Sequence, residues 1–138
     1  MNTNEIKKII SYWIATARHD YETMNSLFKN RRYSDSLFFA HIVLEKVLKA
    51  HAVEVLKKQA RYTHNLVLLA EDAKLLLSEE EWNLLAEVNR FNIRTRYPDE
   101  KLQFYKQCTK AYTQDYLTKI KKLHNNLCLK LRKNKLKE

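Results

Sequence analysis

Apolar residues recur every three or four positions along most of this chain, which is the spacing expected when one face of an α-helix is buried. The first such stretch predicts a helix from about Asn4 to Phe28. The chain has no glycine and a single proline, so it lacks the turn residues with which strands are normally punctuated. The pattern therefore predicts an all-α fold.

A second helix is predicted to cover about residues 34–57, with Ser34 or Asp35 accepting hydrogen bonds from the free N–H groups of its first turn. Its apolar residues occupy more than one side, which is typical of a helix at the centre of a domain. Glu45 and Lys49 stand four positions apart, so their side chains can pair along the helix.

Two further helices have recognisable starts. Thr63 or Asn65 can cap a short helix over about residues 66–77. Ser78 and Glu81 have the spacing of a capping box, in which each side chain hydrogen-bonds the backbone of the other residue. This box predicts a fourth helix that runs on toward an arginine-rich segment.

A last helix is predicted to begin between about Phe104 and Thr113 and to end near Lys133. Together these elements predict an up-and-down bundle of four longer helices plus a short extra helix. We find no linker, repeat or low-complexity segment, so we expect residues 1–138 to form a single domain with a basic C-terminal end.

The segment Arg90–Asp99 contains three arginines and the only proline of the chain. Proline disfavours helix for the residue before it and has no N–H to donate, so Tyr97 should be extended. The segment is therefore predicted to be a polar connection between two rigid helices. Connections held by rigid elements often carry binding or catalytic groups.

The residue types of this connection suit a phosphodiester ligand. Guanidinium groups such as Arg94 and Arg96 bind phosphate through two parallel hydrogen bonds. Tyr97 can stack on a base or donate its hydroxyl, and Asp99 can orient an arginine or accept a proton. A structural interpretation stays open as well, in which Arg90 and its neighbours form a network that joins the last two helices.

The net charge of +10 is distributed unevenly. Residues 1–116 carry eighteen basic and fifteen acidic residues, whereas the last 22 residues have one acid against eight basic side chains. A basic terminal helix can collect phosphates, or it can simply keep a protein in solution. The basic residues of this tail are Lys119, Lys121, Lys122, Lys130, Arg132, Lys133, Lys135 and Lys137.

Several classes of protein do not fit the sequence. The apolar runs are too short to cross a bilayer and the N-terminus has no apolar signal core, so we expect a cytoplasmic protein. Cys108 and Cys128 lie far apart without a Cys-x-x-Cys partner, as is typical of reduced thiols. A chain without glycine has no glycine-rich phosphate loop, and we expect no cofactor.

A metal site is not predicted either. His124 and Cys128 are spaced to share an ion, but they supply only two ligands where zinc requires three or four. His41 and His51 lie ten residues apart on the second helix, which is too far for one ion. We expect these two histidines to be hydrogen-bonded within the core or at a subunit interface.

Four segments together resemble the HEPN domain, the higher eukaryotes and prokaryotes nucleotide-binding domain. Trp13–Asp20 is similar to the opening helix of that family, and Tyr33–Ala50 to its central helix with the pattern Glu-Lys-x-x-Lys-Ala. His64–Leu66 is similar to its His-Asp/Asn-Leu turn, and Asn92–Asp99 to its Arg-Tyr-Pro segment. The order and spacing of the four segments make the resemblance fairly specific, and it covers nearly the whole chain.

The resemblance implies a homodimeric helical bundle, often paired with a minimal nucleotidyltransferase in toxin-antitoxin or other defence systems. Many HEPN proteins are metal-independent ribonucleases with an arginine followed, after four to six variable residues, by a histidine. No histidine follows Arg90, Arg94 or Arg96 at that spacing, and Arg61 is too close to His64. RNA cleavage therefore does not follow from the resemblance.

Three hypotheses result. The leading one is a nucleotide- or RNA-binding protein, homodimeric and paired with a nucleotidyltransferase-like protein. The second is a metal-independent ribonuclease with a site composed from both subunits, and the third is a non-catalytic protein-interaction module. The candidate residues are Arg94, Arg96, Tyr97 and Asp99 for catalysis, and Lys49, Arg90, Arg94 and Arg96 for nucleotide or RNA binding.

Overall fold

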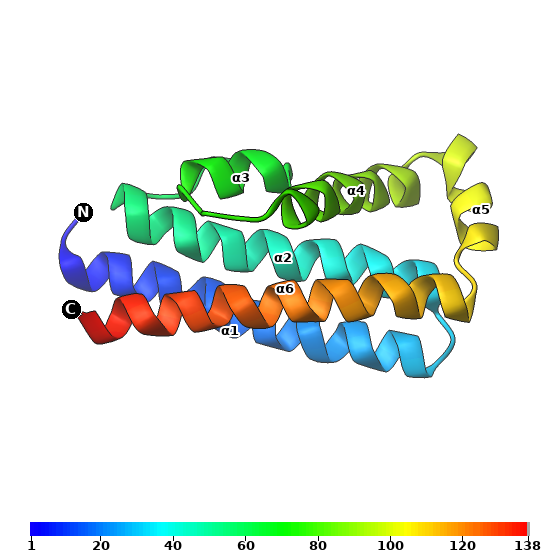
Figure 1. The fold of residues 1–138 in the computed structure, drawn as a ribbon, viewed down its shortest axis with the longest axis horizontal. Coiled ribbons are helices and arrows are strands. Elements are labelled where there is room, and N and C mark those ends of the chain that lie inside the picture. Colours follow the sequence, from blue (N-terminus) through cyan, green and yellow to red (C-terminus); the bar gives the residue numbers. More distant parts are fainter. Residues whose placement is uncertain (138) are drawn as a thin grey trace.

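The computed structural model describes residues 1–137, with side chains as far as Leu131. All regular structure in this part of the chain is helical, which confirms the predicted fold class (Figure 1). The four longer predicted helices and the short insert are present, and one further short helix, α5, had not been predicted. The helices are α1 (Thr3–Lys29), α2 (Tyr33–Leu56), α3 (Leu66–Asp72), α4 (Glu79–Arg96), α5 (Pro98–Gln107) and α6 (Lys110–Lys137).

Helix α2 is the centre of the bundle, as its apolar residues on several sides predicted. It contacts each of the other five helices, and Figure 1 shows it between α3 and α4 on one side and α1 and α6 on the other. Leu44 and Leu48 are completely buried along it. At its start, Ser36 donates its hydroxyl to the carbonyl of Met24 in α1, 2.9 Å away. Neither of the predicted caps, Ser34 or Asp35, caps this helix, because it begins one residue earlier, at Tyr33.

The other predicted caps are present. Asn65 accepts hydrogen bonds from two backbone N–H groups at the start of α3. Ser78 and Glu81 form the complete capping box of α4, with distances of 3.0 and 3.1 Å. Helix α3 ends at Asp72 and not near residue 77, because the backbone turns into the left-handed region at Lys74, where φ is 53°.

The core histidines are satisfied as predicted. His41 donates from Nε2 to the carbonyl of His64, and His51 donates from Nε2 to the carbonyl of Leu127, at 2.9 and 2.8 Å. Since a carbonyl only accepts, Nε2 carries the hydrogen in both rings. The second bond joins α2 to α6, and burial lowers the pKa of His51 below the ordinary value of a histidine.

Candidate functional site

The arginine-rich segment is helical, which corrects the prediction of a polar connection. Helix α4 continues through Arg96 and α5 begins at Pro98, so Tyr97 alone lies between them. Tyr97 is extended, with φ −91° and ψ 124°, as the following proline requires. Pro98 does not interrupt the chain any further, because the first position of a helix needs no N–H donor.

The helical backbone separates the three arginines. Arg90 and Arg94 are four residues apart and share one side of α4, whereas Arg96 lies roughly 200° around the helix from Arg94 at 100° per residue. None of the three guanidinium groups is ion-paired with a carboxylate of the residues whose side chains are described. Their charges are therefore not neutralised within this part of the chain.

Arg94 has a structural role at the junction of α4 and α5. Its guanidinium lies 4.8 Å from the centre of the Phe104 ring and donates to the side-chain oxygen of Gln107. Phe104 is fully buried and stacks on Phe91, with ring centres 5.3 Å apart. Arg94 is consequently half-buried and fixes α5 against α4, as the structural interpretation of the segment predicted for this one arginine.

The remaining candidates of the segment are exposed. Arg90 and Arg96 reach solvent, 60% of Tyr97 is exposed, and Asp99 lies exposed in the first turn of α5. Positive side chains at the C-terminal end of α4 are also favoured by its helix dipole. We call the candidates of the whole segment, including Arg94, the arginine end of α4: Arg90, Arg94, Arg96, Tyr97 and Asp99.

A second polar group lies partly buried between α2 and the connection before α3, and sequence reasoning did not recognise it as a group. It consists of His41, Glu45, Lys49 and His64, which we call the Glu45 cluster. Glu45 accepts from Nζ of Lys49 at 3.1 Å through one oxygen and from Nδ1 of His64 at 2.9 Å through the other. Nδ1 of His41 lies 3.9 Å from the latter oxygen, within reach of its charge but beyond hydrogen-bond distance.

Electrostatics connect the Glu45 cluster to the arginine end of α4. The pKa of His41 is lowered, chiefly because the ring is desolvated by burial. The carboxylate of Glu45 and the hydrogen bond to the backbone carbonyl of His64 oppose this shift, while the His64 side chain and the charge of Arg96 add to it. Arg96 therefore lies close enough for its charge to act on a ring of the cluster, and His41 is kept neutral.

The same side of α4 is polar along its length. Asn89, Asn92 and Arg96 share this side, and the amide of Asn89 donates to the Asn65 side chain at 3.0 Å. Asn89 also accepts the backbone N–H of Leu66 at 2.9 Å. The side-chain oxygen of Asn92 is buried without a hydrogen-bond partner among the described residues. The side of α4 that carries Arg96 thus faces the connection before α3, in which His64 lies.

Lys49 does not lie at the exposed arginine end of α4. Its side chain is 8% exposed, is paired with Glu45 and places Nζ 5.0 Å from the centre of the Trp13 ring on α1. Lys49 is therefore a buried partner of the Glu45 carboxylate and does not reach the surface. Its spacing of four residues from Glu45 had indicated the pair but not its burial.

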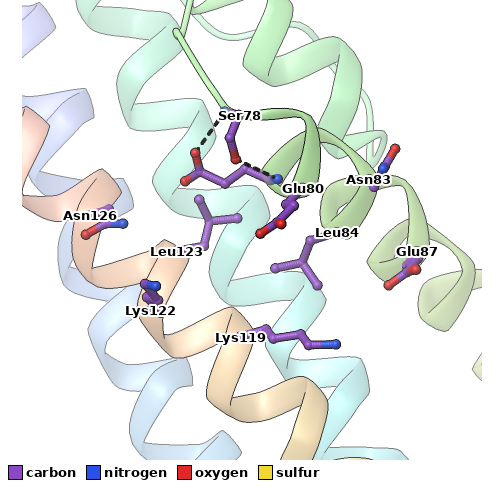
Figure 2. Close-up of a pocket in the computed structure, with 10 residues that line it drawn as sticks. Ser78, Glu80, Asn83, Leu84, Glu87, Lys119, Lys122, Leu123 and Asn126 are labelled. Atoms are coloured by element: carbon purple, nitrogen blue, oxygen red, sulfur yellow. Dashed lines mark hydrogen bonds between the residues drawn. The ribbon is translucent and has the colours of Figure 1, made fainter.

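A groove of about 650 Å³ lies between the first half of α4 and the middle of α6 (Figure 2). Its α4 wall is acidic and its α6 wall carries lysines, so the two walls largely compensate each other's charge. None of the residues that line the groove belongs to the arginine end of α4. Its lining residues are Ser78, Glu80, Glu81, Asn83, Leu84, Glu87, Lys119, Lys122, Leu123 and Asn126.

The basic tail is only partly described. Lys119, Lys121, Lys122 and Lys130 lie on α6, and the Lys130 ammonium donates to the carbonyl of Leu76 at 3.2 Å. The side chains of Arg132, Lys133, Lys135 and Lys137 lie outside the described residues.

The described residues form neither a metal site nor a membrane-spanning helix. No group of three or more His, Cys, Asp or Glu side chains is arranged to hold a metal ion within them. No helix of this part of the chain is long and apolar enough to cross a membrane.

Comparison with known proteins places the chain in a family. A crystal structure of the protein TT1696 from Thermus thermophilus has the same fold, with a TM-score of 0.72 over 86% of this chain and 94% of that chain, at 19% sequence identity. No protein of curated function matches the sequence. A family model described as HEPN domain matches residues 10–131. The chain therefore belongs to the HEPN domain family.

Proposed function

We propose that this protein binds RNA at the arginine end of α4. The observation that carries the proposal is the presence of guanidinium groups without carboxylate partners, among the described residues, beside an exposed tyrosine. Unpaired arginines supply the charge-assisted hydrogen bonds that phosphates accept, and an aromatic ring supplies a surface for base stacking. Membership of a nucleotide-binding family supports the same class of ligand.

The placement of the arginines favours a strand over a single nucleotide. Arg90 and Arg96 are separated by about 120° around α4 and by about 9 Å along its axis, from 100° and 1.5 Å per residue. Two side chains that diverge in this way are poorly placed to share one phosphate group. A strand that passes over the end of α4 presents successive phosphates to the two arginines. Tyr97 follows Arg96 in the chain, and its ring stacks on a base of the strand.

The other residues have supporting roles in this proposal. Arg94 holds α5 in place and offers its remaining N–H groups to the strand. Asp99 is exposed in the first turn of α5, and its negative charge limits how closely a phosphate approaches the start of that helix. Lys49 acts indirectly, because it fixes Glu45 and does not reach the surface.

The cellular setting belongs to the proposal as well. As the family resemblance implies, the protein forms a homodimer and acts with a minimal nucleotidyltransferase in a toxin-antitoxin or other defence system. Cys108 and Cys128 are not joined in a disulfide, which suits a reducing compartment such as the cytoplasm.

Fluorescence anisotropy with a labelled single-stranded RNA tests the binding proposal, starting at low salt where phosphate contacts are strongest. Arg90→Ala and Arg96→Ala should each weaken binding about tenfold, because a hydrogen bond to a charged group contributes roughly 1.5 kcal/mol. Arg18→Ala on α1 is the matched control, since this arginine is also exposed. Tyr97→Phe should retain stacking that Tyr97→Ala loses.

Two results would overturn the proposal. One is the absence of RNA binding by the unmodified protein at low salt. The other is equal weakening by Arg18→Ala and Arg96→Ala, which would show that only net charge matters.

A further inference from the structure

A thiol and an imidazole lie side by side on α6, because residues four positions apart share one face of a helix. Sγ of Cys128 is 3.5 Å from Nε2 of His124. Nδ1 of the same ring is 3.4 Å from the side-chain oxygen of Asn125. Since an amide oxygen only accepts hydrogen bonds, Nδ1 carries the hydrogen, and the lone pair of Nε2 accepts the thiol hydrogen of Cys128.

The ring of His124 is held where α6 meets α1. Its centre lies 4.6 Å from the centre of the Tyr21 ring on α1, with an angle of 30° between the two planes. Burial lowers the pKa of His124, and the hydrogen bond to Asn125 opposes this shift. The ring is therefore neutral at pH 7, which is the state in which an imidazole accepts a proton.

The two cysteines of the chain have opposite surroundings. Cys108 is buried, and burial raises its pKa to about 12, so it stays an unreactive thiol. Cys128 is half-buried and packs against the core, with an acceptor for its proton beside the sulfur. A small reagent can reach a sulfur in this position, and Cys108 serves as the internal reference for its reactivity.

We propose that Cys128 is a site of oxidation by hydrogen peroxide, with His124 as the base that takes the thiol proton. As Nε2 of His124 takes this proton, the sulfur attacks one oxygen of the peroxide. The bond between the two peroxide oxygens breaks, and the departing oxygen receives the proton from His124 and leaves as water. The sulfur is oxidised to a sulfenic acid and the peroxide is reduced.

Cys108 cannot close a disulfide with the oxidised Cys128. It lies before the start of α6, and the helix from Lys110 to Cys128 is about 27 Å long at 1.5 Å per residue. The Cα atoms of a disulfide lie within about 7 Å of each other. The sulfenic acid therefore condenses with a thiol of another molecule, such as a low-molecular-weight cellular thiol, to form a mixed disulfide and water.

The test treats the reduced full chain with hydrogen peroxide in the presence of dimedone, which traps sulfenic acids, and follows each cysteine by mass spectrometry. We expect dimedone on Cys128 and none on Cys108. The same reaction of the urea-unfolded chain measures both thiols without their surroundings. Cys128 should react faster in the folded chain than in the unfolded chain, whereas partial burial alone would only slow the approach of the reagent.

Variants of the base complete the experiment. His124→Ala should lower the rate at Cys128 in the folded chain by about 10²-fold, the low end of the effect of a positioned general base. His124→Gln retains a polar side chain but has no basic nitrogen, so it should show a similar loss. His19→Ala is the matched control, because this histidine is 78% exposed on α1, and it should react like the unmodified protein. Circular dichroism of each variant shows whether it is folded.

Three results would overturn the proposal. One is slower labelling of Cys128 in the folded chain than in the unfolded chain. Another is an unchanged rate at Cys128 in folded His124→Ala or His124→Gln, and the third is equal labelling of both cysteines in the folded protein. RNA enters none of these measurements, so their results are independent of the proposed RNA binding.

Discussion

Replacing Glu45 tests whether the Glu45 cluster is a buried charge network. The carboxylate of Glu45 and the ammonium of Lys49 are 3.1 Å apart, and their side chains are only 11% and 8% exposed. Removing one partner of a buried pair leaves the other charge buried without a partner, which lowers the free energy of unfolding by about 3–5 kcal/mol. Because both side chains retain a little solvent, we expect Glu45→Met to lower the free energy of unfolding by about 3 kcal/mol, near the lower limit of that range.

The complementary variants should cost less. Lys49→Met should lower the free energy of unfolding by about 2 kcal/mol, because Glu45 still has His64 as a partner. The double variant Glu45→Met with Lys49→Met should lie within about 1 kcal/mol of the unmodified protein, since apolar side chains of similar volume replace the pair. The two single effects should therefore fail to add by several kcal/mol.

Urea unfolding followed by circular dichroism measures these free energies. An exposed pair with the same helical spacing, Asp115 and Lys119, is 3.2 Å apart and serves as the matched control. Asp115→Ala should change the free energy of unfolding by less than about 0.5 kcal/mol. Single effects at Glu45 and Lys49 that add to the effect of the double variant would refute a coupled buried pair, as would a greater loss for Lys49→Met than for Glu45→Met.

Three more predictions follow from buried groups and caps. Burial raises the pKa of Cys108 to about 12, so iodoacetamide at pH 8 should leave this thiol unmodified until urea unfolds the chain, as mass spectrometry would show. Ser78→Ala should cost about 1 kcal/mol in urea unfolding, because it removes one half of the capping box, and an unchanged midpoint would contradict this. The pKa values of His41 and His51 are lowered in the folded chain, so on acidification the unfolded chain binds protons first. The contribution of the two neutral rings to the free energy of unfolding is therefore complete above about pH 6.5, the ordinary value of a histidine. Below that pH the contribution falls by up to about 1.4 kcal/mol per pH unit for each histidine. Stability that is unchanged between pH 7 and pH 5 would contradict the assigned neutral rings.

The features that could be predicted from the sequence are those fixed by local interactions. The capping box at Ser78 joins residues three apart, and the central position of α2 follows from apolar residues on several of its sides. Helix α5 was missed because Pro98 was interpreted as the end of regular structure. Proline is equally a residue of the first helical turn, and the acidic residues Asp99 and Glu100 that follow it are typical of a helix start.

The Glu45 cluster could not be derived from spacing, because its hydrogen bonds join residues far apart in sequence. Glu45 and His64 are separated by a helix end and a connection, and no local pattern predicts which side of the connection faces α2. The signal that existed was the family resemblance, whose central-helix and His-Asn-Leu segments supply the two residues. A resemblance of that kind indicates that the residues matter but not that they touch.

The helical course of the arginine-rich segment changes its chemistry as well as its shape. In a loop, three arginines can gather on one phosphate, whereas on α4 the direction of each is fixed by its position. Arg94 contacts Phe104 of α5, while Arg96 lies on the side of α4 that also carries Asn89 and Asn92. The contact of Arg94 with α5 and the exposure of Arg96 to solvent therefore follow from the helical course of the segment, in which residues two apart lie on opposite sides.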